Sequence, residues 1–283
     1  MLSTPCGPTV LDSAQMPLDL LLALSGLLAG AFGALLGLGG GVLIVPILTL
    51  GFGLPLTAAI GTSLICVIAT STGAAAMNVR AGRADVRLGV TLGAGTAVGA
   101  LSGGLLAGYL PERLLAGLFA AMLVYTALTM MRGLLRSRRS VTGEPPVDPT
   151  APDGPNAPSY RTHRLPLAIT GAFGGGNLSG LLGVGGGIVT VPIIHLLMRA
   201  PMQVAVTTSN FMIGITAAAG SYAYLLRGDI DARVAAPVVL GVAIGGVAGA
   251  ALSARLRTSL LVGLFVLVLG YVAWQMAQRA IAG

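Results

Sequence analysis

The sequence predicts an all-α polytopic membrane protein built from two inverted-topology repeats, and three observations carry this prediction. Apolar residues make up 55% of the 283 residues, charged residues make up 9%, and the mean hydropathy is +0.90, whereas soluble domains carry about a quarter charged residues. A twelve-residue element occurs twice, and the loop charges move to opposite sides between its two copies. Each repeat is expected to hold a Gly-broken short or re-entrant helix and about three to four full transmembrane helices.

All basic residues of the chain are arginines, and they leave a net charge of +7 against nine acids. Because the arginines lie between apolar runs, they are expected to set membrane topology, and no nucleic acid partner is expected. Cys6 and Cys66 fit neither a disulfide framework nor a metal cluster, so no metal and no cofactor is predicted. The first seventeen residues contain Asp12 and no basic residue, so the first apolar run is expected to stay in the mature chain.

The repeated element reads LLGLGGGVLIVP at 35–46 and LLGVGGGIVTVP at 181–192. Eight of the twelve positions are identical, and the offset (181 − 35) is 146 residues. The same offset continues without a gap through the rest of each half, matching Asp85 to Asp231 and Tyr125 to Tyr271. An interrupted segment at the same place in two apolar halves is the main pointer to the binding site of a secondary transporter.

Breaking the sequence at charges, prolines and glycine clusters gives five apolar runs in each half. They lie near 18–37, 42–54, 58–78, 88–109 and 112–132, and again near 165–182, 188–198, 203–226, 235–254 and 259–278. Most have about 20 residues, the length that a helix needs to cross a hydrocarbon core of roughly 30 Å. The second run of each half is too short: residues 188–198 would span only about 16 Å. Such a run is expected to enter part-way or to join an extended stretch sheltered by protein.

These runs divide the chain into four regions. Residues 1–17 are predicted by topology to form an extracytoplasmic tail, and residues 18–132 form repeat 1. Residues 133–164 form a linker rich in arginine and proline, which is expected to be flexible and cytoplasmic. Residues 165–279 form repeat 2.

Loop charges test this orientation. Loop 80–87 carries three arginines and one aspartate (3 − 1 = +2), and its counterpart 227–233 carries two of each (2 − 2 = 0). Loop 111–113 has no net charge, and its counterpart 255–257 carries two arginines. Placing the positive loops in the cytoplasm puts equivalent loops on opposite sides, which is the charge pattern of inverted repeats. Both termini then lie outside, whether the first two runs cross fully or form a re-entrant pair; a single broken crossing would reverse this.

The glycine triplets are the first candidate binding residues. Glycine permits a positive φ and close approach of a ligand to the backbone, and each triplet precedes an apolar run with an early proline, which suits a helix N-terminus. Unpaired N–H groups and the positive end of the helix dipole would attract an anion there. The alternative is close helix packing through small residues. The predicted residues are Gly39, Gly40 and Gly41 in the first half and Gly185, Gly186 and Gly187 in the second.

Matched polar side chains follow near the start of the third run of each half. Thr62 and Ser63 correspond to Thr208 and Ser209, which Asn210 follows. Their hydroxyl and amide donors are expected to coordinate oxyanion oxygens without adding charge. The alternative is hydrogen bonding between helices or back to the preceding turn.

His195 is the only ionisable group clearly inside an apolar run, so it is a candidate for proton coupling; an interfacial histidine without a role is the alternative. Asn78 and Asn177 are weaker polar candidates. All nine acids lie in termini, linker or short loops, so no intramembrane carboxylate is available as a proton relay or cation ligand. Asp85 and Asp231 are expected to stabilise loop ends, with gating ion pairs as the alternative.

The motifs GLGGGVLIVP and GVGGGIVTVP, with their matched Thr-Ser pairs, strongly resemble those of the sulfite exporter TauE/SafE family of bacterial membrane proteins, over Leu20 to Gln278. The resemblance implies multi-pass transport in the bacterial inner membrane, of sulfur-containing anions such as sulfite, sulfonates or related organosulfur compounds. Only the glycine motifs and Thr-Ser pairs carry over residue by residue.

The predicted function is therefore a secondary transporter that moves a small sulfur-containing anion by alternating access. A proton would travel on the substrate itself, as bisulfite, or through His195. The expected partners are the anionic substrate and the lipid bilayer, and no pattern predicts an oligomeric state. An anion channel of the same architecture is the alternative. A membrane enzyme is less favoured because no nucleophile, His and carboxylate occur together in the apolar runs.

Overall fold

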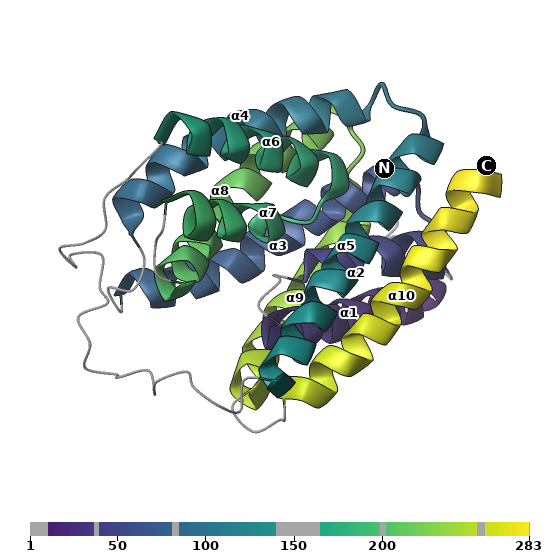
Figure 1. The fold of residues 1–283 in the computed structure, drawn as a ribbon. Helices are drawn as coiled ribbons and strands as arrows, with labels where there is room; N and C mark the ends of the chain where they lie inside the picture. The colour runs from purple at the N-terminus through teal and green to yellow at the C-terminus, as the bar shows by residue number, and fades with distance from the viewer. Residues whose placement is uncertain are drawn as a thin grey trace.

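The computed structural model describes residues 11–36, 40–80, 85–139, 165–198, 202–253 and 258–282, and within these ranges every regular element is a helix. The predicted all-α polytopic membrane fold is confirmed (Figure 1). The first half comprises α1 (Leu11–Leu36), α2 (Gly41–Pro46), the π-helical segment η1 (Ile47–Gly51), α3 (Leu56–Arg80), α4 (Val86–Ala107) and α5 (Glu112–Arg139). The second comprises α6 (Leu165–Leu182), α7 (Gly187–Pro192), the π-helical segment η2 (Ile193–Leu197), α8 (Met202–Arg227), α9 (Ala232–Ser253) and α10 (Thr258–Ala282).

Each apolar run of the sequence corresponds to one helix or to a short helix with its π-helical continuation. Within the described ranges, α3, α4, α5 and α9 contain stretches long and apolar enough to cross a membrane. Two boundaries differ from the prediction: α1 begins at Leu11, inside the predicted tail, and α5 continues to Arg139, inside the predicted linker. In α5, backbone hydrogen bonding continues past the apolar run through leucine and arginine, which are good helix formers, whereas hydropathy marks only the part of a helix that suits hydrocarbon. Residues 1–10 and 140–164 lie outside the described ranges.

In both halves the short helix folds back along the helix before it. A Cβ added to Gly40 would lie 3.4 Å from the Ala29 carbonyl oxygen of α1, and Ile44 of α2 lines the same small gap as Ser25 and Gly26. In the second half Gly186 lies near Ser179, Val189 near Gly175, and Ile193 near Gly171. The numbering rises along one helix as it falls along the other, so each pair is an antiparallel hairpin rather than one broken crossing.

The two halves are interlocked through glycines that occupy equivalent positions. Helix α1 packs along α9, and the equivalent α6 packs along α4. An added Cβ at any of four glycines would lie within 2.1 to 2.4 Å of a carbonyl oxygen of the opposing helix, so only glycine allows this approach. The contact of Gly30 with Val242 is equivalent to that of Gly176 with Thr96, and the contact of Gly245 with Leu27 is equivalent to that of Gly99 with Phe173. Equivalent residues differ by 146 in number.

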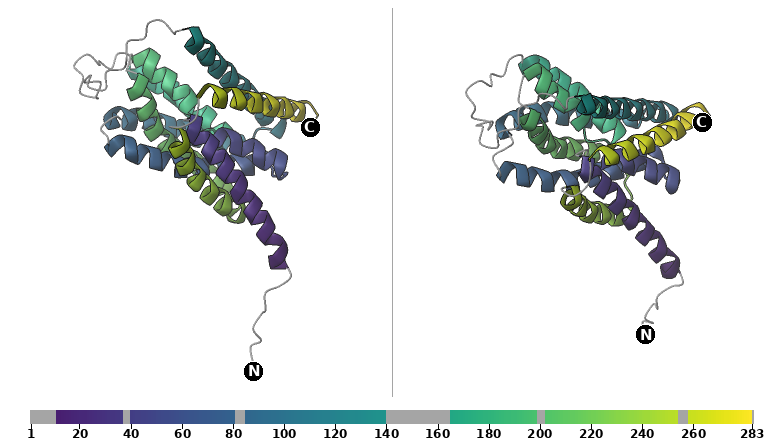
Figure 2. Two further views of the ribbon diagram at one scale, coloured as in Figure 1. Left: turned by 90° about the horizontal axis from the view of Figure 1, so that it is seen from below. Right: turned by 60° about the horizontal axis from the view of Figure 1, so that its bottom comes forward.

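Helices α3 and α8 form the centre of the bundle and run antiparallel. Their neighbouring residues are Gly61 with Tyr224, Leu64 with Gly220, and Ser71 with Gly214. Helices α5 and α10 also pack together antiparallel, along one side of the bundle (Figure 2). Both are pairs of equivalent helices from the two halves.

Loop ends are held by side chains that cap helices. Asp85 accepts a hydrogen bond from the backbone N–H of Leu88 at the start of α4, and Asp231 accepts one from that of Arg233. At the other end of α4, Arg227 donates to the Gly104 carbonyl and pairs with Asp229 at 2.7 Å. The predicted role of Asp85 and Asp231 at loop ends is confirmed, since both act as caps.

Candidate functional site

Both short helices begin at a glycine in the left-handed conformation. Gly40 precedes α2 with φ 78°, and Gly186 precedes α7 with φ 74°. Each carbonyl accepts the first hydrogen bonds of its helix, from Leu43 at 3.1 Å and from Val189 at 3.0 Å. Non-glycine residues rarely adopt this conformation. The predicted helix N-termini are confirmed at both repeats, while Gly39 lies outside the described residues.

The glycine breaks lie at mid-length of the central helices. A Cβ added to Gly41 would lie 2.7 Å from Cγ2 of Val67, and one added to Gly187 would lie 2.7 Å from Cδ1 of Ile213. Val67 is the twelfth of the 25 residues of α3, and Ile213 is the twelfth of the 26 residues of α8. Gly185 lies between these same two side chains. Val67 and Ile213 are themselves 146 residues apart, so equivalent side chains cover the two breaks.

Both predicted serines lie at the breaks. The Ser63 hydroxyl donates to the carbonyls of Gly41 at 3.2 Å and Gly183 at 2.9 Å, so it joins the short helix of one half to the break of the other. Ser209 shares a hydrogen bond of 2.6 Å with Thr190 of α7. Both serines are fully buried. The structure therefore brings Ser63, Ser209, Gly40, Gly41 and the second triplet to one place.

Among the other predicted polar residues, some form hydrogen bonds between helix segments, and for the rest the structure gives only their burial. The Thr208 hydroxyl accepts from the backbone N–H of Asp85 at 3.1 Å, so it holds the start of α4. Thr62 is buried on α3, and Asn210 is half-buried on α8. Asn177 donates to the Ser102 hydroxyl at 3.1 Å, the interhelical bond expected of a packing residue.

His195 belongs to η2, and its side chain lies outside the described part of the structure, as does that of Asn78. The role of His195 in proton coupling remains a prediction. In the described ranges, no three His, Cys, Asp or Glu side chains gather as a metal site would require.

Ser179 is a polar residue of this site that the sequence reading missed. Its side chain is 3% exposed, and its hydroxyl has no hydrogen-bond partner among the described residues. A Cβ added to Gly186 would lie 3.4 Å from the Ser179 hydroxyl oxygen, so this hydroxyl faces the cap of α7. The equivalent residue of the first half is Gly33, so a search for matched polar pairs passes over Ser179. The available signal was a hydroxyl one turn before Gly183, in the helix leading to the break.

Comparisons with known proteins match most of the chain to membrane transporters. The family model described as Sulfite exporter TauE/SafE matches residues 22–276. The Bacillus subtilis probable membrane transporter protein YunE is 29% identical over 270 residues, covering 92% of this chain and 98% of the relative. The probable membrane transporter protein MJ0441 of Methanocaldococcus jannaschii is 30% identical over 212 residues, covering 72% of each chain. The probable membrane transporter protein YdhB of Bacillus subtilis is 27% identical over 237 residues, 83% of this chain and 89% of the relative. No solved structure matches the chain.

Proposed function

The chain belongs to the sulfite exporter TauE/SafE family and is a membrane transporter rather than an enzyme, and on that premise we propose that it moves a small sulfur-containing anion by alternating access. The substrate class is sulfite, a sulfonate or a related organosulfur compound, and the membrane is the bacterial inner membrane. The proposed binding residues are the two glycine breaks with Ser63, Ser209 and Ser179.

The unpartnered hydroxyl of Ser179 is the observation that carries this proposal. A buried polar group without a partner is uncommon and points to a water or ion that completes its hydrogen bonding. Its neighbour Gly186 begins a helical segment, and the first-turn N–H groups of such a segment have no acceptor within the helix. In the first half, α2 and η1 form a continuous segment of 11 residues, Gly41–Gly51, long enough for a helix dipole to attract an anion.

The hydrogen-bond donors at the glycine breaks suit a transported ligand, which must bind and then dissociate. Hydroxyl and backbone N–H groups bind an oxyanion through hydrogen bonds, and none of them carries a full charge. The anion would replace contacts that the protein makes internally in this structure, such as those from Ser63 to the carbonyls of Gly41 and Gly183. Val67 and Ile213 would have to move aside, because they occupy the space beside the glycines.

The packing of the helices supports an inverted repeat and suggests which parts move. Inverted repeats are related by a pseudo-two-fold axis in the membrane plane, and such an axis would pair equivalent helices antiparallel. The pairs α3 with α8 and α5 with α10 have this arrangement. The glycine contacts join α1 to α9 and α6 to α4. Helices α2 and α3 pack with the first pair and α7 and α8 with the second, which defines two bodies that meet where α3 contacts α8. Alternating access would then be a rocking of these bodies at the α3–α8 contact, each body carrying one short helix.

Transport by purified protein in proteoliposomes tests the anion assignment. Labelled sulfite, thiosulfate or an alkyl sulfonate should accumulate by counterflow against the same unlabelled anion. Gly40→Val and Gly186→Val should abolish uptake with protein still present in the membrane, since both positions have positive φ. Gly174→Val is the matched control, because an added Cβ there meets no atom within 4 Å. Unchanged uptake in both break variants would mean that the motif serves packing alone, and current without counterflow would establish a channel.

Disulfide locking tests the proposed motion. In a background without the two native cysteines, Ser71→Cys with Gly214→Cys places two Cβ atoms 3.8 Å apart across α3 and α8, a normal disulfide separation. Oxidation should stop transport, and reduction should restore it. The control pair Gly117→Cys with Ala280→Cys has the same Cβ separation, 3.8 Å, across α5 and α10. Transport that continues with α3 and α8 linked would refute movement at this contact.

A further inference from the structure

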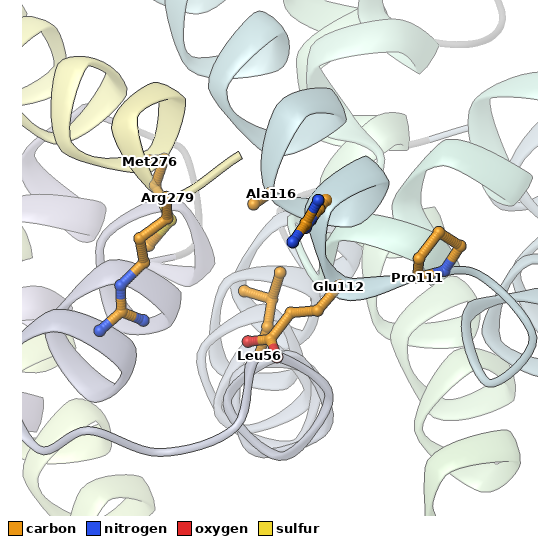
Figure 3. Close-up of a pocket in the computed structure, with 7 residues that line it drawn as sticks. Leu56, Pro111, Glu112, Ala116, Met276 and Arg279 are labelled. Atoms are coloured by element: carbon orange, nitrogen blue, oxygen red, sulfur yellow. The ribbon is translucent and has the colours of Figure 1, made fainter. Parts of the chain in front are cut away.

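A cavity of about 500 Å³ lies away from the glycine breaks, where three helices end (Figure 3). It is bounded by the first turns of α3 and α5 and by the last turns of α10. Its polar walls are Glu112 and Arg113 of α5 and Arg279 of α10. The apolar walls are Leu56, Pro111, Ala116 and Met276.

The cavity has an excess of positive charge: two arginines against one glutamate give 2 − 1 = +1. Among the described residues, neither arginine forms an ion pair with Glu112, which in Figure 3 points toward Leu56. Arg279 donates one hydrogen bond, from Nη2 to the Thr49 carbonyl of η1 at 3.0 Å, which fixes the guanidinium at the cavity wall. A planar guanidinium with further N–H donors is the side chain best suited to an oxyanion.

We propose that this cavity binds an oxyanion carried on a small apolar group, with Arg113 and Arg279 holding the oxyanion. A volume of about 500 Å³ far exceeds what a lone inorganic anion needs and falls in the range of pockets for small organic molecules. The four apolar walls give the organic part of such a ligand a surface to bury. This site is separate from the proposed transport site, and its existence does not depend on which anion crosses the membrane.

The ends of membrane helices lie near the membrane–water interface, so two sources can supply this chemistry. One is a soluble alkyl sulfonate, and the other is the headgroup of an anionic phospholipid. Both present an oxyanion on an apolar stem. Separate arms of one experiment distinguish them.

Protection of an introduced thiol measures occupancy at this cavity alone. Pro111 is an exposed wall residue, so Pro111→Cys, made with Cys6→Ser, gives a reactive thiol there, while Cys66 is buried. The full chain in detergent is labelled with an uncharged maleimide, and the labelling rate is measured at increasing concentrations of propane-1-sulfonate. Tetramethylammonium is the cationic control. The labelling rate is measured again in phosphatidylcholine vesicles with and without phosphatidylglycerol. We expect the sulfonate, the anionic lipid or both to slow the labelling. The cation should leave the labelling rate unchanged.

Charge variants make the result specific. Arg113→Gln and Arg279→Gln each remove a charged donor. Each should therefore raise about tenfold the concentration of sulfonate or anionic lipid that halves the labelling rate. Glu112→Gln should lower this concentration several-fold, an opposite sign that misfolding cannot imitate. Arg233→Gln is the matched control: like Arg113, Arg233 is the exposed second residue of a helix, and its loss should change nothing. No protection by either anion, or protection that persists in both arginine variants, would overturn the proposal.

Discussion

Replacing Ser179 by alanine should make the protein more stable and a poorer transporter. Ser179 is 3% exposed, and its hydroxyl has no partner among the described residues. A buried unsatisfied hydroxyl costs about 1–3 kcal/mol, and alanine removes that cost while leaving a gap of one oxygen. We therefore expect a net gain of about 1 kcal/mol, seen as a rise in Tm of about 2–4 °C for a chain of this size in detergent.

The effect on transport should have the opposite sign. A hydrogen bond from a neutral donor to a charged group contributes about 1.5–3 kcal/mol. Since about 1.4 kcal/mol corresponds to a factor of ten, Ser179→Ala should lower the initial rate of anion uptake at limiting substrate by about 10- to 100-fold. Measuring uptake and Tm on the same preparation compares the two directly.

Ser71→Ala is the control for this experiment. Ser71 is also a buried serine in a long helix, but its hydroxyl donates to the Ile68 carbonyl at 3.2 Å. Its replacement should leave uptake unchanged and should not raise Tm. A Ser179→Ala protein with lowered Tm and normal uptake would refute the reasoning, because the hydroxyl would then serve the fold.

Three further predictions, two of them with a control substitution, rest on the same contacts. Gly186→Ala should lower Tm, because left-handed backbone costs a non-glycine residue about 1–2 kcal/mol, while Gly174→Ala, with no atom within 4 Å of the added Cβ, should not. Gly176→Ala should reduce the yield of folded protein in gel filtration, because its Cβ would lie 2.1 Å from the Thr96 carbonyl oxygen and separate α6 from α4. Asp85→Ala should lower stability by about 1 kcal/mol through loss of the α4 cap, whereas Asp85→Asn should retain it in the same thermal melt.

Two glycine triplets show what local sequence predicts and what it leaves open. Gly185, Gly186 and Gly187 break the chain, with positive φ at the first two. Residues 174–176 are also three glycines, yet they lie inside α6, where Gly176 allows α4 to approach. One glycine triplet therefore breaks a helix, and the other allows close helix packing. The repeat separates them, because 185–187 recurs at 39–41 and 174–176 aligns with Leu28, Ala29 and Gly30.

Helix number and order could be predicted because hydrophobic run length reflects the thickness of the bilayer. The depth of the breaks could not, because it depends on how far each short helix returns along its neighbour. Gly40 lies beside Ala29 of α1, and Gly41 beside Val67 at mid-length of α3. These contacts join residues from 11 to 26 positions apart, and no local pattern specifies them.

The polar groups at the breaks are less symmetric than the scaffold that holds them. Ser63 and Ser209 are equivalent and reach both breaks. Ser179 and Thr190 belong to the second half alone, since the equivalent residues of the first half are glycine and isoleucine. The two repeats thus hold similar backbone sites, and the side chains around the second site are richer in hydrogen-bond donors. Selectivity for one anion over another should therefore depend more on the second half, and its determinants are residues that comparison of the two repeats cannot reveal.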